Sequence, residues 1–283
     1  MSENILKIEE LHYKYPDGTC ALNGINMDIK RGEVTAILGG NGAGKSTLFH
    51  HLNGINKPSS GKIYFNGKEF DYSRKGLKKL RQDVGIVFQD PDSQLFSASV
   101  YQDISFGPMN MKLKEEEIRK RVDFAIKETK IEHLKDKPTH ALSFGQKKRV
   151  SIAGILVMEP KVLILDEPTA GLDPMGVSDI MSLLMDMKKK LNLTIIISTH
   201  DIDIVPLYCD KVFVMDKGKV ILEGTPDEVF REKEKIRKIH LRLPRVAHLM
   251  EILKEKDGFE FSNIESTIGK ARKAFKAWRD NLK

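Results

Sequence analysis

The sequence predicts an α/β fold with a mixed central sheet, an antiparallel edge subdomain, an inserted α-helical subdomain and a small C-terminal helical appendage. Several short runs are almost wholly β-branched or apolar, which is typical of strands covered on both faces in a parallel sheet. In chain order these runs are VTAIL, VGIVF, KVLILDE, LTIIIST and KVFVMD. The stretches between them have helical character, so we expect an α/β core.

The N-terminal segment predicts the antiparallel part. Leu11, Tyr13 and Tyr15 alternate with polar residues and lead into the turn-forming residues 16–18, Pro-Asp-Gly. Alternation with a period of two, followed by a turn, indicates antiparallel strands at a sheet edge.

Between residues 90 and 159 the composition becomes helical. The run MKLKEEEIRKRVDFAIKET places Ile118, Val122 and Ala125 on one face and charged residues on the other. We therefore expect a helical subdomain at about residues 90–160, inserted into a main domain that covers residues 1–235.

The chain becomes rich in Lys and Arg from about Arg231, and Pro244 ends any continuous helix there. Residues 236–283 are therefore predicted to form a separate helical extension. Its last segment carries an apolar stripe at helical spacing, made of Ile268, Ala271, Phe275, Trp278 and Leu282. A stripe of this length must pack on something, and the main domain and another subunit are both open as partners.

Composition limits the function without choosing it. The 47 basic and 40 acidic residues give a formal charge of +7, which suits nucleic acid, an anionic membrane surface, acidic partners or nucleotides. The apolar runs are far shorter than the ~20 residues that span a bilayer, and the start lacks the pattern of a secretory signal. We expect a cytoplasmic protein whose two cysteines, Cys20 and Cys209, are small buried hydrophobes.

One motif predicts phosphate binding. Residues 39–47 match G-x-x-x-x-G-K-[ST], follow the strand-like VTAIL and precede the helical LFHHL, which is the context this motif requires. Backbone N–H groups and a helix N-terminus would hold the phosphates, while Lys45 would meet the β- and γ-phosphates and Ser46 would ligate Mg²⁺. A plain glycine-rich turn is the weaker alternative. The predicted nucleotide-binding loop consists of Gly39, Gly40, Asn41, Gly42, Ala43, Gly44, Lys45, Ser46 and Thr47.

Two carboxylates follow the buried run VLIL. Asp166 and Glu167 stand at its C-terminal end, where open α/β sheets bind their ligands. Asp166 would hold Mg²⁺ and Glu167 would polarise the attacking water. Alone, the pair is read more readily as ordinary surface acids. Next to a phosphate loop, the catalytic interpretation is favoured.

The segment LSFGQKKR, residues 142–149, resembles the signature sequence of ATP-binding cassette (ABC) proteins. Phe144 stands where the family usually has glycine, but the capping residue Ser143 and the small Gly145 are kept. The resemblance implies that Ser143, Gly145 and Gln146 contact the ATP held by a facing subunit. The segment could also be only a helix cap. Its place ahead of Asp166 favours the signature interpretation.

The same resemblance gives roles to four single residues. It implies that Gln89 senses Mg²⁺ and the membrane partner, that Asp173 communicates across a dimer, and that His200 contacts the γ-phosphate. Tyr15 would stack on adenine, with Tyr13 as the competing candidate and core packing as the alternative for either ring. Outside the family pattern, such single polar residues are more often solvated or locally hydrogen-bonded.

The resemblance covers about residues 5–235 and implies an ATPase with ATP and Mg²⁺ as cofactors. Two facing subunits, in a homodimer or a heterodimer, would share two ATP molecules. The stretch QDPDSQLFSASVYQDISFGP and the basic extension are similar to energy-coupling-factor importers, particularly those for cobalt, with nickel and vitamins as alternatives. Such an importer implies an integral membrane coupling protein, a substrate-binding membrane component and a place on the inner face of the cell membrane. The likeness to importers with C-terminal dimer contacts favours a subunit contact for the stripe.

Three rival functions stay open on the sequence. A chromosome- or repair-associated cassette ATPase would suit the basic charge, but the segment between the phosphate loop and the signature shows no sustained heptads. A translation-associated cassette protein normally has two motor domains on one chain. A phosphate-loop kinase would leave the signature unexplained. No nucleic-acid partner is therefore expected.

Overall fold

The computed structural model describes residues 3–281 of the 283-residue chain. The strands are β1 (Asn4–Lys14), β2 (Cys20–Lys30), β3 (Val34–Leu38), β4 (Ser60–Phe65), β5 (Lys68–Glu69), β6 (Val84–Val87), β7 (Val162–Leu165), β8 (Thr194–Ser198), β9 (Lys211–Asp216) and β10 (Lys219–Gly224). The helices are α1 (Lys45–Leu52), α2 (Arg74–Asp83), α3 (Val100–Asn110), α4 (Glu115–Glu128), α5 (Phe144–Leu156), α6 (Pro174–Leu191), α7 (Val205–Tyr208), α8 (Pro226–Arg231), α9 (Lys233–Lys238), α10 (Arg245–Lys256) and α11 (Ile268–Asn281). The predicted mixed α/β fold is confirmed.

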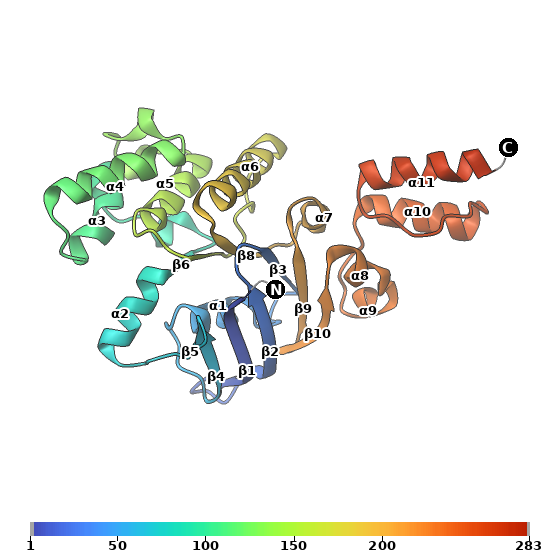
Figure 1. Ribbon diagram of the computed structural model, residues 1–283, viewed down its shortest axis with the longest axis horizontal. Coiled ribbons are helices and arrows are strands. Elements are labelled where there is room, and N and C mark those ends of the chain that lie inside the picture. The colour runs from blue at the N-terminus through green and yellow to red at the C-terminus, as the bar shows by residue number, and fades with distance from the viewer. Residues whose placement is uncertain (1–2, 282–283) are drawn as a thin grey trace.

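Two sheets make up the centre of the molecule (Figure 1). The larger has the order β10-β9-β3-β8-β7-β6, with parallel pairing from β9 to β6 and an antiparallel β9–β10 hairpin. The N-terminal strands are antiparallel, as expected, and form a sheet of their own in the order β2-β1-β4-β5. Strand β3 is thus an inner strand, and the loop that follows it leaves from the middle of the larger sheet.

Alternation along the inner strands builds two apolar layers. On one face of the larger sheet, Ile37, Ile164 and Ile196 join α1 and the inner residues of the antiparallel sheet. On the other face, Leu165 and Ile197 join the helices α3 to α8. Helix α1 is therefore enclosed between the two sheets, which fixes the start of that helix against the strand ends.

Strand register brings the polar ends of β7 and β8 together. Leu165 pairs with Ile197 in parallel alignment, and Ile37 pairs with Ser198. Asp166 therefore follows its strand at the level of Ser198, on the same face as Ile164 and Ile196, because side chains alternate with a period of two. That face is the one covered by α1.

The helices α3 to α5 and the C-terminal helices lie at opposite ends of the larger sheet, near β6 and near β10 (Figure 1). Helices α3, α4 and α5 pack together in the region predicted to be an inserted subdomain. No helix among residues 3–281 is long and apolar enough to cross a bilayer.

The C-terminal stripe packs within the chain. Ala271, Phe275 and Trp278 of α11 join a small apolar cluster with Met250 of α10 and Phe261. The expectation named the main domain or another subunit as the partner, and in the structure this partner is the preceding helix. Ile268 is 77% exposed and lies outside that cluster. Leu282 lies outside the described residues.

The expectation of two buried cysteines is right for one of them. Cys209 is buried, and burial raises the pKa of its thiol to about 12. Cys20 is exposed, so the expectation is wrong for this residue. The physical reason is its place as the first residue of β2, which is an edge strand of the antiparallel sheet.

Candidate functional site

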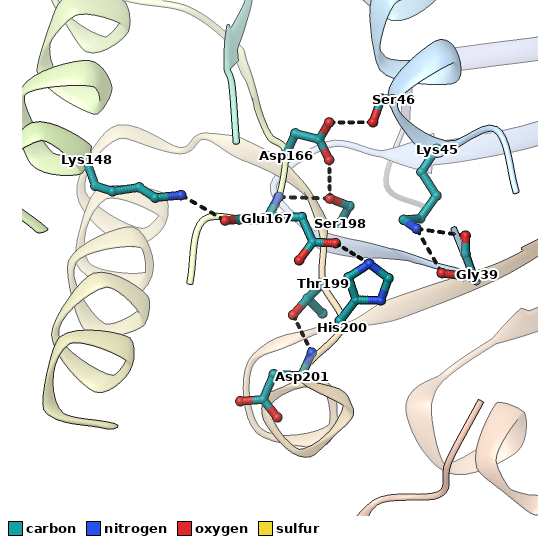
Figure 2. A network of polar contacts seen from close by, with 11 residues as sticks. Gly39, Lys45, Ser46, Lys148, Asp166, Glu167, Ser198, Thr199, His200 and Asp201 are labelled. Carbon is teal, nitrogen blue, oxygen red and sulfur yellow. Dashed lines mark hydrogen bonds and ion pairs between the residues drawn. The ribbon is translucent and has the colours of Figure 1, made fainter. Parts of the chain in front are cut away.

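The phosphate loop, residues 39–47, joins β3 to α1. The ammonium group of Lys45 donates to the carbonyl oxygens of Gly39 at 2.8 Å and Gly40 at 3.2 Å (Figure 2). Burial lowers the pKa of Lys45, and the nearby carboxylates oppose that shift. Gly44 has φ +101°, and a Cβ there would lie 2.6 Å from a backbone oxygen of β2, so only glycine suits this tight entry into the helix.

One hydroxyl group links Asp166 to the loop, and a second, from the end of β8, links Asp166 to Glu167. Ser46 Oγ donates to Asp166 Oδ2 at 2.7 Å, and Ser198 Oγ donates to Asp166 Oδ1 at 2.5 Å. Ser198 also accepts the Glu167 N–H at 2.9 Å. Glu167 Oε1 lies 3.0 Å from His200 Nε2. Figure 2 shows these five side chains as one continuous polar network between the helix and the strand ends.

Glu167, the second residue after the end of β7, has a left-handed backbone with φ +51°. A non-glycine residue in this region carries strain that the surroundings must hold in place. Its N–H is held by Ser198, and its carbonyl oxygen accepts from Lys148 Nζ at 2.9 Å and from Ala170 N–H at 3.1 Å. The strained turn directs the two neighbouring carboxylates to different partners, Ser46 for Asp166 and His200 for Glu167.

A cavity of about 230 Å³ lies over this network. It is bordered by seven loop residues and by four side chains from the strand ends. They are Asn41, Gly42, Ala43, Gly44, Lys45, Ser46, Thr47, Gln89, Asp166, Glu167 and His200. Backbone N–H groups, one ammonium and two carboxylates meet here, a combination that suits a polyphosphate together with a hard cation.

The donor set fits Mg²⁺. Ser46 Oγ and Asp166 Oδ2 are already in contact, and Gln89 adds an amide oxygen at the border of the cavity. Mg²⁺ is commonly held by one or two carboxylates together with substrate phosphates rather than by an all-protein cage. Within residues 3–281 there is no cluster of three or more His, Cys, Asp or Glu side chains that could hold a metal by itself.

The two candidate tyrosines differ in exposure. Tyr15 is 37% exposed, and its hydroxyl lies 2.9 Å from Thr47 Oγ1 at the end of the phosphate loop. Tyr13 is partly buried in the layer around α1, with its ring edge-on to His51 at a centroid distance of 4.5 Å. Its exposure and its contact with the loop favour Tyr15 as the ring that is available to stack on a nucleotide base.

The signature residues and Asp173 do not border this cavity. Ser143 caps α5 and accepts the Gln146 N–H, while the Gln146 side chain accepts the Ser143 N–H, so both are joined in a capping box. Asp173 caps α6 and accepts the Gly176 N–H at 2.7 Å. Ser143 and Asp173 are not buried, and they would meet a ligand only from outside this chain's own site.

Sequence reasoning missed two residues of the network, Ser198 and Lys148. The run IISTHD did contain Ser198, but only the histidine was singled out. Lys148 lies inside the signature and is buried, which a Lys-rich helix start does not suggest. The sequence signal that could have found Lys148 is its position, because the first turns of α5 place residue 148 on the inner face of the helix with Ser151 and Ile152.

Comparison with known proteins gives a consistent result. A family model described as "ABC transporter" matches residues 22–170. The energy-coupling factor transporter ATP-binding protein EcfA3 of Clostridium perfringens is 73% identical over 282 residues, covering 100% of this chain and 99% of that protein. The solved structure of cbiO1 from the same organism, described as part of the ABC transporter complex cbiONQ, has a TM-score of 0.78 at 76% identity over 88% of this chain and all of that one.

A second solved structure is more distant. It is a dimeric ATP-binding cassette in a post-hydrolysis state, bound to ADP and phosphate, with a TM-score of 0.71 at 28% identity. The match covers 78% of this chain and 98% of that chain. The resemblance therefore reaches cassettes that have been observed as nucleotide-bound dimers.

Proposed function

This chain belongs to the ABC transporter family as an ATP-binding subunit of the energy-coupling factor type, and from that premise we propose that it drives cobalt import. Subunits of this family hydrolyse ATP. In the proposal, two copies face each other across two ATP molecules and transmit closure to an integral membrane protein. The polar network that links Ser46, Asp166, Ser198, Glu167 and His200 is the observation that carries the hydrolytic part.

The residues of the cavity divide the reaction between them. Lys45 and the loop N–H groups bind the β- and γ-phosphates and offset their negative charge. Ser46, Gln89 and Asp166 would hold Mg²⁺, which when bound neutralises charge on the phosphate oxygens. The remaining steps belong to Glu167 and to the substrate water.

Hydrolysis requires a water in line with the γ-phosphorus. As the oxygen of this water bonds to phosphorus, Glu167 accepts a proton from the water. The bond from phosphorus to the β–γ bridging oxygen breaks, and ADP is released. His200 Nε2, 3.0 Å from Glu167 Oε1, orients this carboxylate and lies beside the γ-phosphate position at the border of the cavity. Tyr15 stacks on the adenine.

The position of the signature supports a site shared between two copies. The N-terminus of α5, with Ser143 and Gly145, is open to solvent and away from the cavity of its own chain. A second copy would bring this positive helix end to the γ-phosphate. ATP then favours the closed pair because these contacts exist only there, and hydrolysis removes that preference. Asp173 would lie at the same interface.

A groove of about 660 Å³ between α2, α3 and α5 offers a place for the membrane coupling protein. Phe96, 66% exposed, and Phe106 contact each other edge-on inside it, with ring centroids 4.7 Å apart. Gln94 links the groove to the segment after β6 that carries Gln89, because the Gln94 side chain accepts the Phe88 N–H at 3.1 Å. A short helix with an apolar face and acidic ends would suit the aromatic floor and the basic rim made by α2. In this proposal the subunit acts from the inner face of the cell membrane.

The test compares wild type with Glu167→Gln in the native host, at matched protein levels. We expect the variant to bind ATP, to lose nearly all turnover and to stop cobalt uptake. Glu116→Gln serves as a control, because Glu116 is an exposed carboxylate with no ion pair among residues 3–281. Wild-type turnover in Glu167→Gln would remove this residue from its role. Unchanged cobalt uptake with loss of nickel or vitamin uptake would redirect the cargo assignment.

A further inference from the structure

Lys148 is a buried lysine that the proposed reaction does not use. It lies in α5, one turn after the helix start, and it is only 1% exposed. Its ammonium group donates to two backbone carbonyl oxygens, those of Gln89 and Glu167, each at 2.9 Å. Figure 2 shows this side chain reaching from the helix to the carbonyl of Glu167.

Burial of this ammonium group is unfavourable by itself. Desolvation lowers the pKa of Lys148 to about 8, while the charges of Glu167, Asp166 and Asp90 act in the opposite direction. Its hydrogen-bond acceptors are neutral carbonyls, and the ring of Phe144 lies with its centroid 5.4 Å from the ammonium nitrogen. A methionine of similar volume would fill the space without a desolvated charge, so packing does not account for the lysine.

What the lysine holds is specific. One of its two acceptors is the carbonyl of Glu167, the residue whose backbone is left-handed at φ +51°. Ser198 holds the N–H side of the same residue, so the strained residue is held at both ends. The other acceptor belongs to Gln89, whose side chain borders the cavity.

The same helix also begins with the signature segment. Phe144 packs against Gly171, which precedes Asp173 in the chain: a Cβ on Gly171 would lie 2.9 Å from the ring. The helix start is thus in contact with the loop that follows the catalytic carboxylate, and Lys148 connects the next turn to the backbone of Glu167 itself. A shift of α5 relative to β7 must therefore change the hydrogen bonding of Glu167.

We propose that Lys148 is a positioning residue for hydrolysis, which fixes the backbone of Glu167 and links it to Gln89 and to the signature helix. This inference rests on the proposed role of Glu167. The lysine does not touch the nucleotide. It acts by keeping the carboxylate at the distance from the attacking water that in-line attack requires.

The test is steady-state ATPase kinetics of Lys148→Met, which keeps the volume and removes the donors. We expect kcat to fall by ~10–100-fold, the order that a misplacement near 1 Å produces, with KM for ATP and the thermal midpoint close to those of wild type. The kcat of Lys148→Gln, which retains a donor on a shorter side chain, is expected to lie between those of wild type and Lys148→Met. Lys120→Met is the control, because Lys120 is an exposed lysine of α4 that has no ion pair among residues 3–281 and does not border the cavity.

A double-variant experiment separates positioning from other roles. If Lys148 acts through Glu167, adding Lys148→Met to Glu167→Gln lowers the residual rate no further. A kcat of Lys148→Met within twofold of wild type, while Glu167→Gln is inactive, would overturn the inference and leave the proposed function standing. Loss of ATP binding or of folding in parallel with turnover, in both Lys148 variants, would also overturn it. Wild-type turnover in Glu167→Gln would instead remove the premise.

Discussion

Replacing Ser198 with alanine tests how far the site depends on one buried hydroxyl. This group is fully buried, accepts the Glu167 N–H at 2.9 Å and donates to Asp166 Oδ1 at 2.5 Å. The variant leaves one buried donor and one carboxylate oxygen without these partners. Each unsatisfied buried group costs ~1–3 kcal/mol of stability, and the cost for the carboxylate should be near the lower end of this range because it borders the cavity. We therefore expect the free energy of unfolding to fall by about 3 kcal/mol.

That loss corresponds to a fall of roughly 5 °C in the thermal midpoint for a chain of 283 residues, measured by circular dichroism without nucleotide. Ser151→Ala is the control, because it is the same chemical change at another fully buried serine. The Ser151 hydroxyl has no hydrogen-bond partner among the described residues. Since alanine is also the better helix former, this control should be unchanged or stabilised by about 0.5 kcal/mol.

Equal midpoints for Ser198→Ala and Ser151→Ala would refute the reasoning, because burial and lost volume are the same in both. Equal midpoints would mean that the two hydrogen bonds of Ser198 add no measurable stability. Restoration by Ser198→Thr, in which a hydroxyl is present, would strengthen the hydrogen-bond account.

The fold leads to three further predictions. A thiol reagent should label Cys20 in the native protein and reach Cys209 only after denaturation, because the second thiol is buried with a pKa of about 12; labelling of both in the folded state would contradict this. Gly171→Ala should lower the free energy of unfolding in urea by about 1–3 kcal/mol, since φ is +76° and the new Cβ would meet Phe144 at 2.9 Å. Adding Phe144→Gly to this variant should recover only the part of the lost stability that comes from the steric clash. Full recovery would show that backbone strain is absent. Glu251→Gln should speed trypsin cleavage within the last two helices, because this buried carboxylate pairs with two cations of α9, and an unchanged cleavage rate would argue against the ion cluster as their anchor.

The sequence is sufficient for those parts of the site that depend on local pattern. The loop at residues 39–47 has its glycines and lysine at fixed spacing, and the strand before Asp166 is continuous in apolar residues, so both can be located from the order of residues alone. The α/β class follows from the same strand runs, because residues covered on both faces leave a recognisable composition.

Other features depend on contacts between distant segments. Ser198 and Lys148 become meaningful only when strand register and helix packing bring them to the backbone of Glu167. The exposure of Cys20 depends on strand order, because nothing local marks β2 as an edge. The partner of the C-terminal stripe likewise depends on how α10 and α11 fold back on each other, which the spacing of apolar residues alone does not determine.

The parallel pairing of β7 with β8 makes the site tolerant of one kind of genetic change and intolerant of another. Substitution of Ile196 by valine keeps the strand register, so Ser198 remains beside Asp166. Deletion of one residue within β8 shifts every later side chain to the opposite face, so the serine would turn toward the helices α5 and α6 and away from α1. Over evolutionary time, this segment is therefore free to drift in composition while its length is held constant by the geometry of a single hydroxyl.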